Sequence, residues 1–97
     1  MHIAAGDRLV VRLSSTYWTV SPPASDAVLR AEGPAIVATP PAATSHCVPG
    51  SGCGTVTAVF VARTPGRAVV TAQRTSCGEV LRCTDQQGSY RLTVIVR

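Results

Sequence analysis

Four cysteines are the residues of this 97-residue chain with the clearest capacity for covalent chemistry. They form two pairs of equal spacing, Cys47 with Cys53 and Cys77 with Cys83. Four cysteines allow three pairings, and we expect the local one, in which each bridge closes a short loop. Disulfides form and persist in oxidising compartments. The pattern therefore predicts an extracytoplasmic protein, either secreted or at the cell surface.

A structural zinc site is the alternative use of the same cysteines, with His46 as a further ligand. The ligand cysteines of structural zinc usually have about two to four residues between them, so that both sulfurs reach one tetrahedral ion. The spacing within each pair is longer than that here. We therefore favour disulfides, expect no bound metal and no cofactor, and keep zinc as an alternative.

Groups that could catalyse a reaction are scarce. A nucleophile needs a base within reach and a group that orients the base. The only histidines are His2, at the terminus, and His46, which directly precedes Cys47. In an extended segment neighbouring side chains point to opposite faces, so His46 and Cys47 would point apart. The five acidic residues offer no obvious close pair for glycoside hydrolysis. We expect that the protein is not an enzyme.

The basic residues are all arginines, and the formal net charge is +4 at pH 7. The nine arginines are scattered along the chain, without a basic run. Binding to nucleic acid usually needs a clustered basic patch, often with aromatic platforms, and only 4% of the residues are aromatic. No apolar run approaches the roughly 18 residues of a membrane-spanning helix. We therefore expect neither a nucleic-acid partner nor membrane insertion.

Alternating apolar residues predict the strands that must position these side chains. Thr55–Ala72 contains two alternating runs joined by Thr64-Pro65-Gly66, which we interpret as two adjacent strands of a β-sandwich. The segment Ala27–Ala31 fits either a strand, which we prefer, or a helical turn. The other expected strands are His2–Ala5, Arg8–Leu13, Tyr17–Val20, Ala35–Thr39 and Ser89–Val96. Seven or eight short strands with regular turn signals predict a single all-β domain over residues 1–97, an antiparallel sandwich of about seven strands.

Two long loops, Pro40–Gly54 and Arg74–Gly88, each contain one cysteine pair. A loop held by a disulfide loses less conformational entropy on binding, which suits it to recognition. We therefore predict a non-catalytic binding or spacer module with a protein partner. Arg74, Glu79 and Arg82 are the polar contacts that we expect in the second loop.

We expect Trp18 in the core rather than as a surface anchor, with Tyr17 exposed.

The stretch Thr64-Pro65-Gly66-Arg67-Ala68-Val69-Val70-Thr71-Ala72 resembles the late-strand corner of bacterial immunoglobulin-like domains, which read P-G-x-A-x-V-x-A. Glycine makes the corner, and small or β-branched residues then point into the sandwich. The antibody pattern of a cysteine on each sheet beside a tryptophan is absent, because the cysteines here lie in loops. The resemblance implies an immunoglobulin-like sandwich.

The chain as a whole also resembles the chagasin-like inhibitors of papain-family cysteine proteases, which are immunoglobulin-like. His2–Leu13 is similar to their opening two strands, with a Gly-acid turn at Gly6-Asp7. Tyr17-Trp18 stands roughly where that family has an aromatic pair. The order of elements from Gly54 through Val96 is also the same: strand, Pro-Gly corner, strand, long loop and final strand. The resemblance implies a cysteine protease as the alternative partner.

That family inhibits through three loops at one end of the sandwich. The resemblance places them at Ser14-Ser15-Thr16, at Pro49–Gly54 and at Arg74-Thr75-Ser76. The family's N-P-T-T-G and R-P-W motifs are missing from the first and third loops, and Gly50-x-Gly52-x-Gly54 only loosely follows its Gly-rich middle loop. The candidate binding residues are Ser15, Thr16, Tyr17, Gly50, Gly52, Arg74, Glu79 and Arg82.

Overall fold

The computed structural model describes residues 1–39, 53–77, 82–84 and 86–97, and this part of the chain is all-β. Within those ranges no helix is long and apolar enough to cross a membrane. The segment of ambiguous type resolves into a turn, in which the amides of Val28 and Leu29 both donate to the Ser25 carbonyl, followed by a strand. The strands are β1 (His2–Ile3), β2 (Arg8–Ser14), β3 (Thr19–Ser21), β4 (Leu29–Ala31), β5 (Ile36–Ala38), β6 (Thr55–Ala62), β7 (Gly66–Gln73) and β8 (Ser89–Val96).

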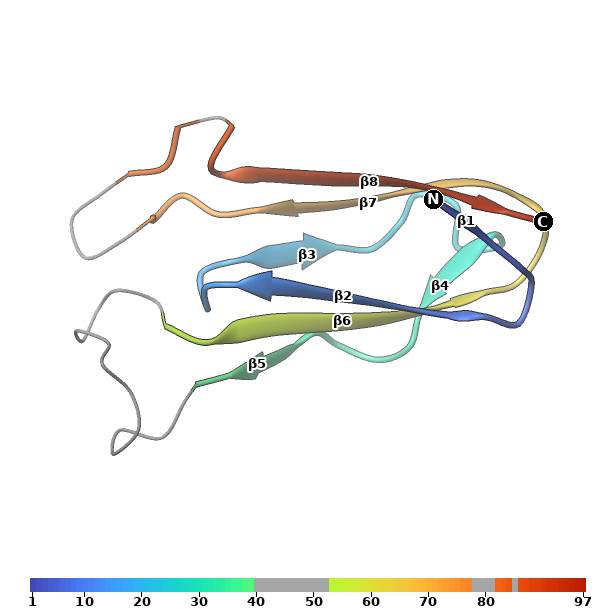
Figure 1. Cartoon of the computed structure of the whole chain (residues 1–97), viewed down its shortest axis with the longest axis horizontal. Helices are drawn as coiled ribbons and strands as arrows, with labels where there is room; N and C mark the ends of the chain where they lie inside the picture. The colour runs from blue at the N-terminus through green and yellow to red at the C-terminus, as the bar shows by residue number, and fades with distance from the viewer. Residues whose placement is uncertain (40–52, 78–81, 85) are drawn as a thin grey trace.

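The strands form two sheets that face each other, an arrangement compatible with a β-sandwich (Figure 1). One sheet has the order β1-β8-β7-β3, and β1 runs parallel to β8 while the other pairs are antiparallel. The second sheet has the order β2-β6-β4, and β5 pairs with β6 beyond β4 along the same edge. The longest strands, β6, β7 and β8, have eight residues each. The all-β class predicted from alternation is therefore confirmed.

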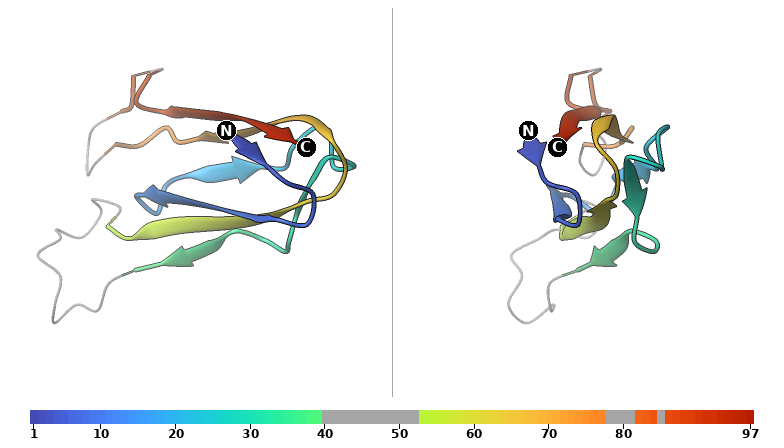
Figure 2. Two further views of the ribbon diagram at one scale, coloured as in Figure 1. Left: turned by 45° about the vertical axis from the view of Figure 1, so that its right-hand side comes forward. Right: turned by 90° about the vertical axis from the view of Figure 1, so that its right-hand side faces the viewer.

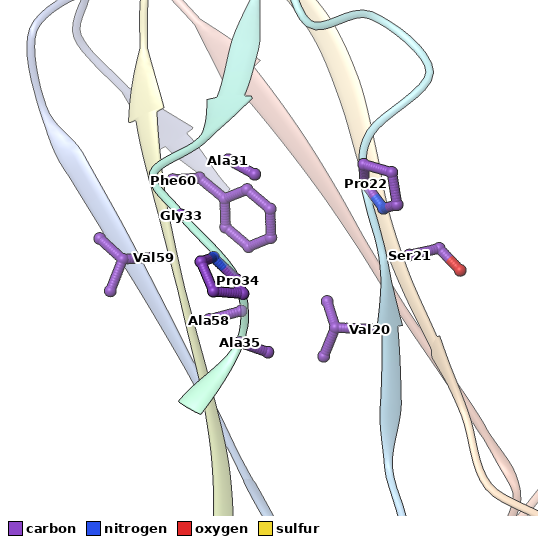
Figure 3. Close-up of a pocket in the computed structure, with 10 residues that line it drawn as sticks. All are labelled: Val20, Ser21, Pro22, Ala31, Gly33, Pro34, Ala35, Ala58, Val59 and Phe60. Atoms are coloured by element: carbon purple, nitrogen blue, oxygen red, sulfur yellow. The ribbon is translucent and has the colours of Figure 1, made fainter. Parts of the chain in front are cut away.

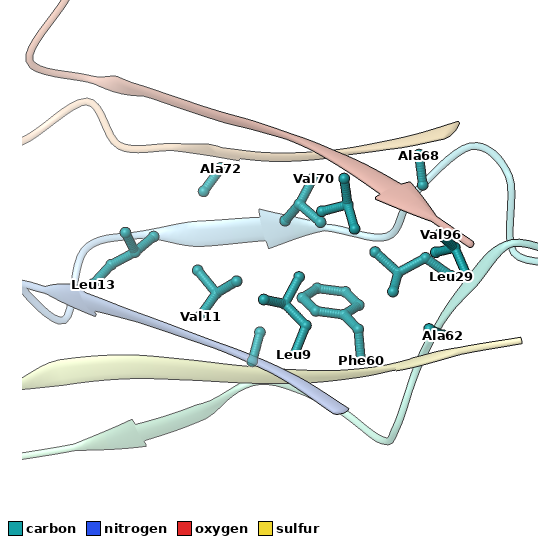
Figure 4. Close-up of a cluster of buried hydrophobic side chains, with 12 residues drawn as sticks. Leu9, Val11, Leu13, Leu29, Phe60, Ala62, Ala68, Val70, Ala72 and Val96 are labelled. Atoms are coloured by element: carbon teal, nitrogen blue, oxygen red, sulfur yellow. The ribbon is translucent and has the colours of Figure 1, made fainter. Parts of the chain in front are cut away.

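The core lies between the sheets and follows the predicted alternation. Leu9, Val11 and Leu13 of β2 are buried, and the residues between them are exposed. Side chains of both sheets point into this layer, around Phe60 (Figure 4). Because the core is built from valine, leucine and alanine with a single buried ring, the sheets can approach closely along their length. The buried residues of β6 and β7 are Val56, Ala58, Phe60, Ala62, Ala68, Val70 and Ala72.

The connection between β6 and β7 corrects the interpretation of these strands as adjacent neighbours. They lie in different sheets, and residues 63–65 carry the chain across the edge of the sandwich (Figures 1 and 2). Each strand already has partners on both sides, since β6 pairs with β2 and β4 and β7 pairs with β8 and β3. The crossing is fastened to the turn before β4. The Arg63 amide donates to the Val28 carbonyl at 2.8 Å, and Thr64 Oγ1 donates to the Ala27 carbonyl at 2.7 Å.

Candidate functional site

Three chain connections leave the two sheets at one end of the molecule, opposite the β6–β7 crossing (Figures 1 and 2). They join β2 to β3, β5 to β6 and β7 to β8. We call their described residues the loop end; they are Ser15–Trp18, Thr39, Cys53–Gly54, Arg74–Cys77, 82–84 and 86–88. The sequence-predicted residues Ser15, Thr16, Tyr17, Arg74 and Arg82 all belong to it. The fold thus brings to one end of the molecule residues as far apart in the sequence as Ser15 and Arg82, which are separated by 67 positions.

The first two connections are joined through the backbone. The Ser15 amide donates to the Gly54 carbonyl at 2.9 Å, and Ser15 adopts a φ of 105° to do so. Its hydroxyl accepts a hydrogen bond from the Tyr17 amide at 3.2 Å, which closes a tight local turn. Gly54 itself has a φ of 132° and packs against Thr16 and Ala38 so closely that a side chain there would collide with both. Tyr17 is half-buried, which corrects the expectation that it is exposed.

The first connection is also joined to the third, through Trp18 and Arg74. The Arg74 guanidinium carbon lies 4.6 Å from the centroid of the Trp18 ring, the geometry of a cation–π contact. Trp18 Nε1 donates to the Ser14 carbonyl at 2.9 Å, and Arg74 Nε donates to the Gln87 carbonyl at 3.0 Å. Trp18 is half-buried and packs against the edge of the core, so its placement there is confirmed in part. One aromatic ring therefore contributes to the core and holds two loops together.

The third connection is closed by the disulfide between Cys77 and Cys83, whose Cα atoms are 5.0 Å apart. This is the local pairing that the spacing predicts. The Cys83 amide donates to the Thr75 carbonyl at 3.0 Å, and an antiparallel bridge joins Ser76 to Arg82, so the bonded loop is also held by its backbone.

Cys53 is disulfide-bonded as well, and Cys47, the partner expected for it, lies outside the described residues. The predicted site residues Gly50, Gly52 and Glu79 also lie outside them. Over the described ranges no group of three or more His, Cys, Asp or Glu residues is arranged to hold a metal ion.

A polar hollow of about 360 Å³ opens beside the disulfide at the loop end. Two predicted contacts, Arg74 and Arg82, line its wall, and none of the lining residues in the described part of the chain is acidic. Two guanidinium groups present many N–H donors for oxygen acceptors, carboxylates above all. The hollow is lined by Gln73, Arg74, Thr75, Arg82, Cys83, Thr84, Gly88 and Ser89.

A second hollow, of about 170 Å³, lies in the seam between β3 and the β4–β5 edge, and no sequence pattern signalled it (Figure 3). Val20 and Phe60 point into it, and Ser21 is the only polar residue among the described residues that line it. Pro22 and Pro34 lie on opposite sides of the seam. A small apolar hollow with one serine among its described lining residues gives a ligand little orientation, so we assign it no role in binding.

No protein-family model, no curated protein and no solved structure matches the chain. The case for a function therefore rests on the loop end and on the strand order.

Proposed function

We propose that the chain is a non-catalytic, extracytoplasmic module of immunoglobulin-like topology that binds a protein partner through the loop end. The observation that carries the proposal is the pair of contacts that join the three connections, Ser15 to Gly54 and Trp18 to Arg74. Loops that are already fixed to one another lose little conformational entropy on binding, so they favour recognition over simple spacing.

The strand order supports the immunoglobulin-like part of the proposal. In constant-type immunoglobulin domains strands A, B, E and D form one sheet and C, F and G the other. Here β2, β6 and β4 follow the order B, E and D, and β3, β7 and β8 follow C, F and G. The difference is β1, which pairs parallel with β8 instead of joining the sheet of β2. The bacterial type of domain suggested by the Pro65-Gly66 corner fits this order.

The chemistry of the loop end indicates what kind of protein surface would bind. Arg74 and Arg82 line the hollow without an ion-pair partner among the described residues. The formal net charge of +4 adds a favourable long-range field for an acidic partner. We therefore expect carboxylates of the partner in this hollow. The disulfide beside it supports the extracytoplasmic location, since such bonds persist in oxidising compartments.

Photo-cross-linking tests the binding role directly. A photoreactive amino acid replaces exposed Thr75 at the loop end, and in a matched control it replaces exposed Arg67 at the opposite end of β7. The full chain is expressed in its own cells, irradiated and recovered from the extracytoplasmic fraction. We expect a discrete covalent adduct from position 75 and none from position 67. Adducts of equal yield at both positions, or none at position 75, would contradict the proposal.

Inhibition of a papain-family cysteine protease is the second candidate. It is favoured by the three connections leaving the sheets at one end, as the wedge of a chagasin-like inhibitor requires. Active papain is titrated with the intact protein, and the Arg74→Glu variant and the Arg67→Glu control are compared. We expect inhibition that only Arg74→Glu weakens. Full papain activity at a large molar excess would eliminate this candidate and leave the cross-linking result unaffected.

A further inference from the structure

The outer face of the β2-β6-β4 sheet carries an unusual set of exposed apolar side chains. In an antiparallel pair, residues directly opposite one another lie on the same face. The strand register therefore aligns Val10 with Val59, and places Arg8 and Arg30 on either side of Val61. On the other side of Val59 along β6, Arg12 and Ile36 lie on either side of Thr57. We call this set the valine face: Val10, Val59, Val61 and Ile36 with Arg8, Arg12 and Arg30 around them.

The apolar members of the valine face are accessible to solvent. Val10 is 55% exposed and Ile36 is 64% exposed, while Val59 and Val61 between them are half-buried. With strand spacings of about 4.8 Å and a rise of about 3.4 Å per residue, the set spans roughly 10 Å by 14 Å. The outward positions of β7 and β8 include Thr71, Gln73 and Thr93, together with Val69 and Ile95, which are half-buried. The large apolar strand residues that are exposed, Val10, Ile36 and Val37, all belong to the sheet of β2 and β6.

The charge around this surface is mainly positive, with three arginines and one carboxylate, Glu32. Arg8 is paired with Glu32 at 2.9 Å, which is the only ion pair among the described residues. Arg12 and Arg30 are exposed and have no acidic partner in that part of the chain. An apolar centre with a polar or charged margin is the usual anatomy of a protein interface. A complementary partner would present an apolar centre with carboxylates at its edge.

We propose that the valine face is a second interaction surface, separate from the loop end, that docks an acidic protein partner. The partner inserts aliphatic side chains over Val10, Val59 and Val61, and its carboxylates pair with Arg12 and Arg30. A second copy of the chain fits poorly, because two-fold packing would bring two faces of net positive charge together. A lipid surface also fits poorly, because the face lacks the Trp and Phe side chains with which proteins anchor in the interface.

An NMR titration of the full chain tests the proposal. The probe is a synthetic helical peptide of about 16 residues with a leucine stripe at i, i+3, i+4 and i+7 flanked by glutamates. A second peptide carries lysines in place of the glutamates. The Arg12→Gln/Arg30→Gln protein is compared with Arg67→Gln/Arg91→Gln, which removes the same charge from exposed positions on the opposite sheet.

We expect the glutamate peptide to shift amide signals of β2, β6 and β4, and added salt to weaken the binding. Binding should fall about three- to tenfold in Arg12→Gln/Arg30→Gln and remain unchanged in the control. Equal binding of the lysine peptide, shifts confined to the loop end, or no shifts would overturn the proposal. So would self-association through this face in sedimentation, or binding to phosphatidylglycerol vesicles without binding to the peptide. None of these results bears on cross-linking from position 75.

Discussion

Trp18 and Gly54, at the loop end, each take part in two structural contacts. Trp18 packs against the core and contacts Arg74, and Gly54 directly precedes β6 while its carbonyl accepts a hydrogen bond from the Ser15 amide. None of these contacts is visible in the sequence. The spacing of the cysteines predicts the Cys77–Cys83 bond because its partners are close along the chain. Trp18 and Arg74, in contrast, are 56 positions apart in the sequence, and no local sequence pattern predicts that they are in contact.

Gly54 supplies the sharpest residue-scale prediction. A methyl group there would meet the Ala38 carbonyl oxygen and lie 2.9 Å from Thr16 Cγ2, and the φ of 132° is itself unfavourable for alanine. We expect Gly54→Ala to lower the free energy of unfolding by about 3 kcal/mol, measured by urea denaturation. Gly33→Ala is the control, because its φ is 81° but nothing lies within 4 Å of the added methyl, and it should cost about 1 kcal/mol. Equal losses in the two variants would show that Gly54 is not in close contact.

At the scale of elements, alternation predicts which residues of a strand are buried but not which strand lies beside it. Buried residues alternate along β2, β6 and β7, as the apolar pattern predicts. The prediction that β6 and β7 are neighbours in one sheet was wrong. A short Pro-Gly link is compatible with a crossing between two sheets as well as with a turn within one sheet. The sequence indicated an apolar outer face on β6, because residues on both faces of this strand are apolar. Only the strand register shows that arginines of β2 and β4 lie around that outer face.

The β6–β7 crossing allows a prediction at the same scale. Thr64→Val keeps the shape of the side chain and removes the hydroxyl that donates to the Ala27 carbonyl at 2.7 Å. The loss of one hydrogen bond should lower the free energy of unfolding by about 1 kcal/mol in chemical denaturation. Thr71→Val on the outer face of β7 is the matched control and should change stability by less than about 0.5 kcal/mol. If both variants are equally stable, the hydroxyl does not fasten the crossing.

At the scale of the whole molecule, the fold separates two surfaces. The loop end lies where three connections meet, and the valine face lies along the side of one sheet. A small core of Val, Leu and Ala supports both, and a disulfide adds stability where the core does not reach. A loop of seven residues closed by a disulfide is worth about 2.4 kcal/mol in the chain-entropy treatment. The proposed extracytoplasmic location and the proposed rigidity of the loop end thus rest on the same cysteines.

The measurement that we would make first is the intact mass of the protein from its native source, alkylated at lysis with and without reductant. We predict that the native protein takes up no label and that the reduced protein takes up four, one for each cysteine. That result would agree with an extracytoplasmic module whose loops are held by disulfides. Uptake of four labels by the native protein would contradict the extracytoplasmic proposal. The cysteines would then have to be interpreted as metal ligands or as thiols of a protein in a reducing compartment.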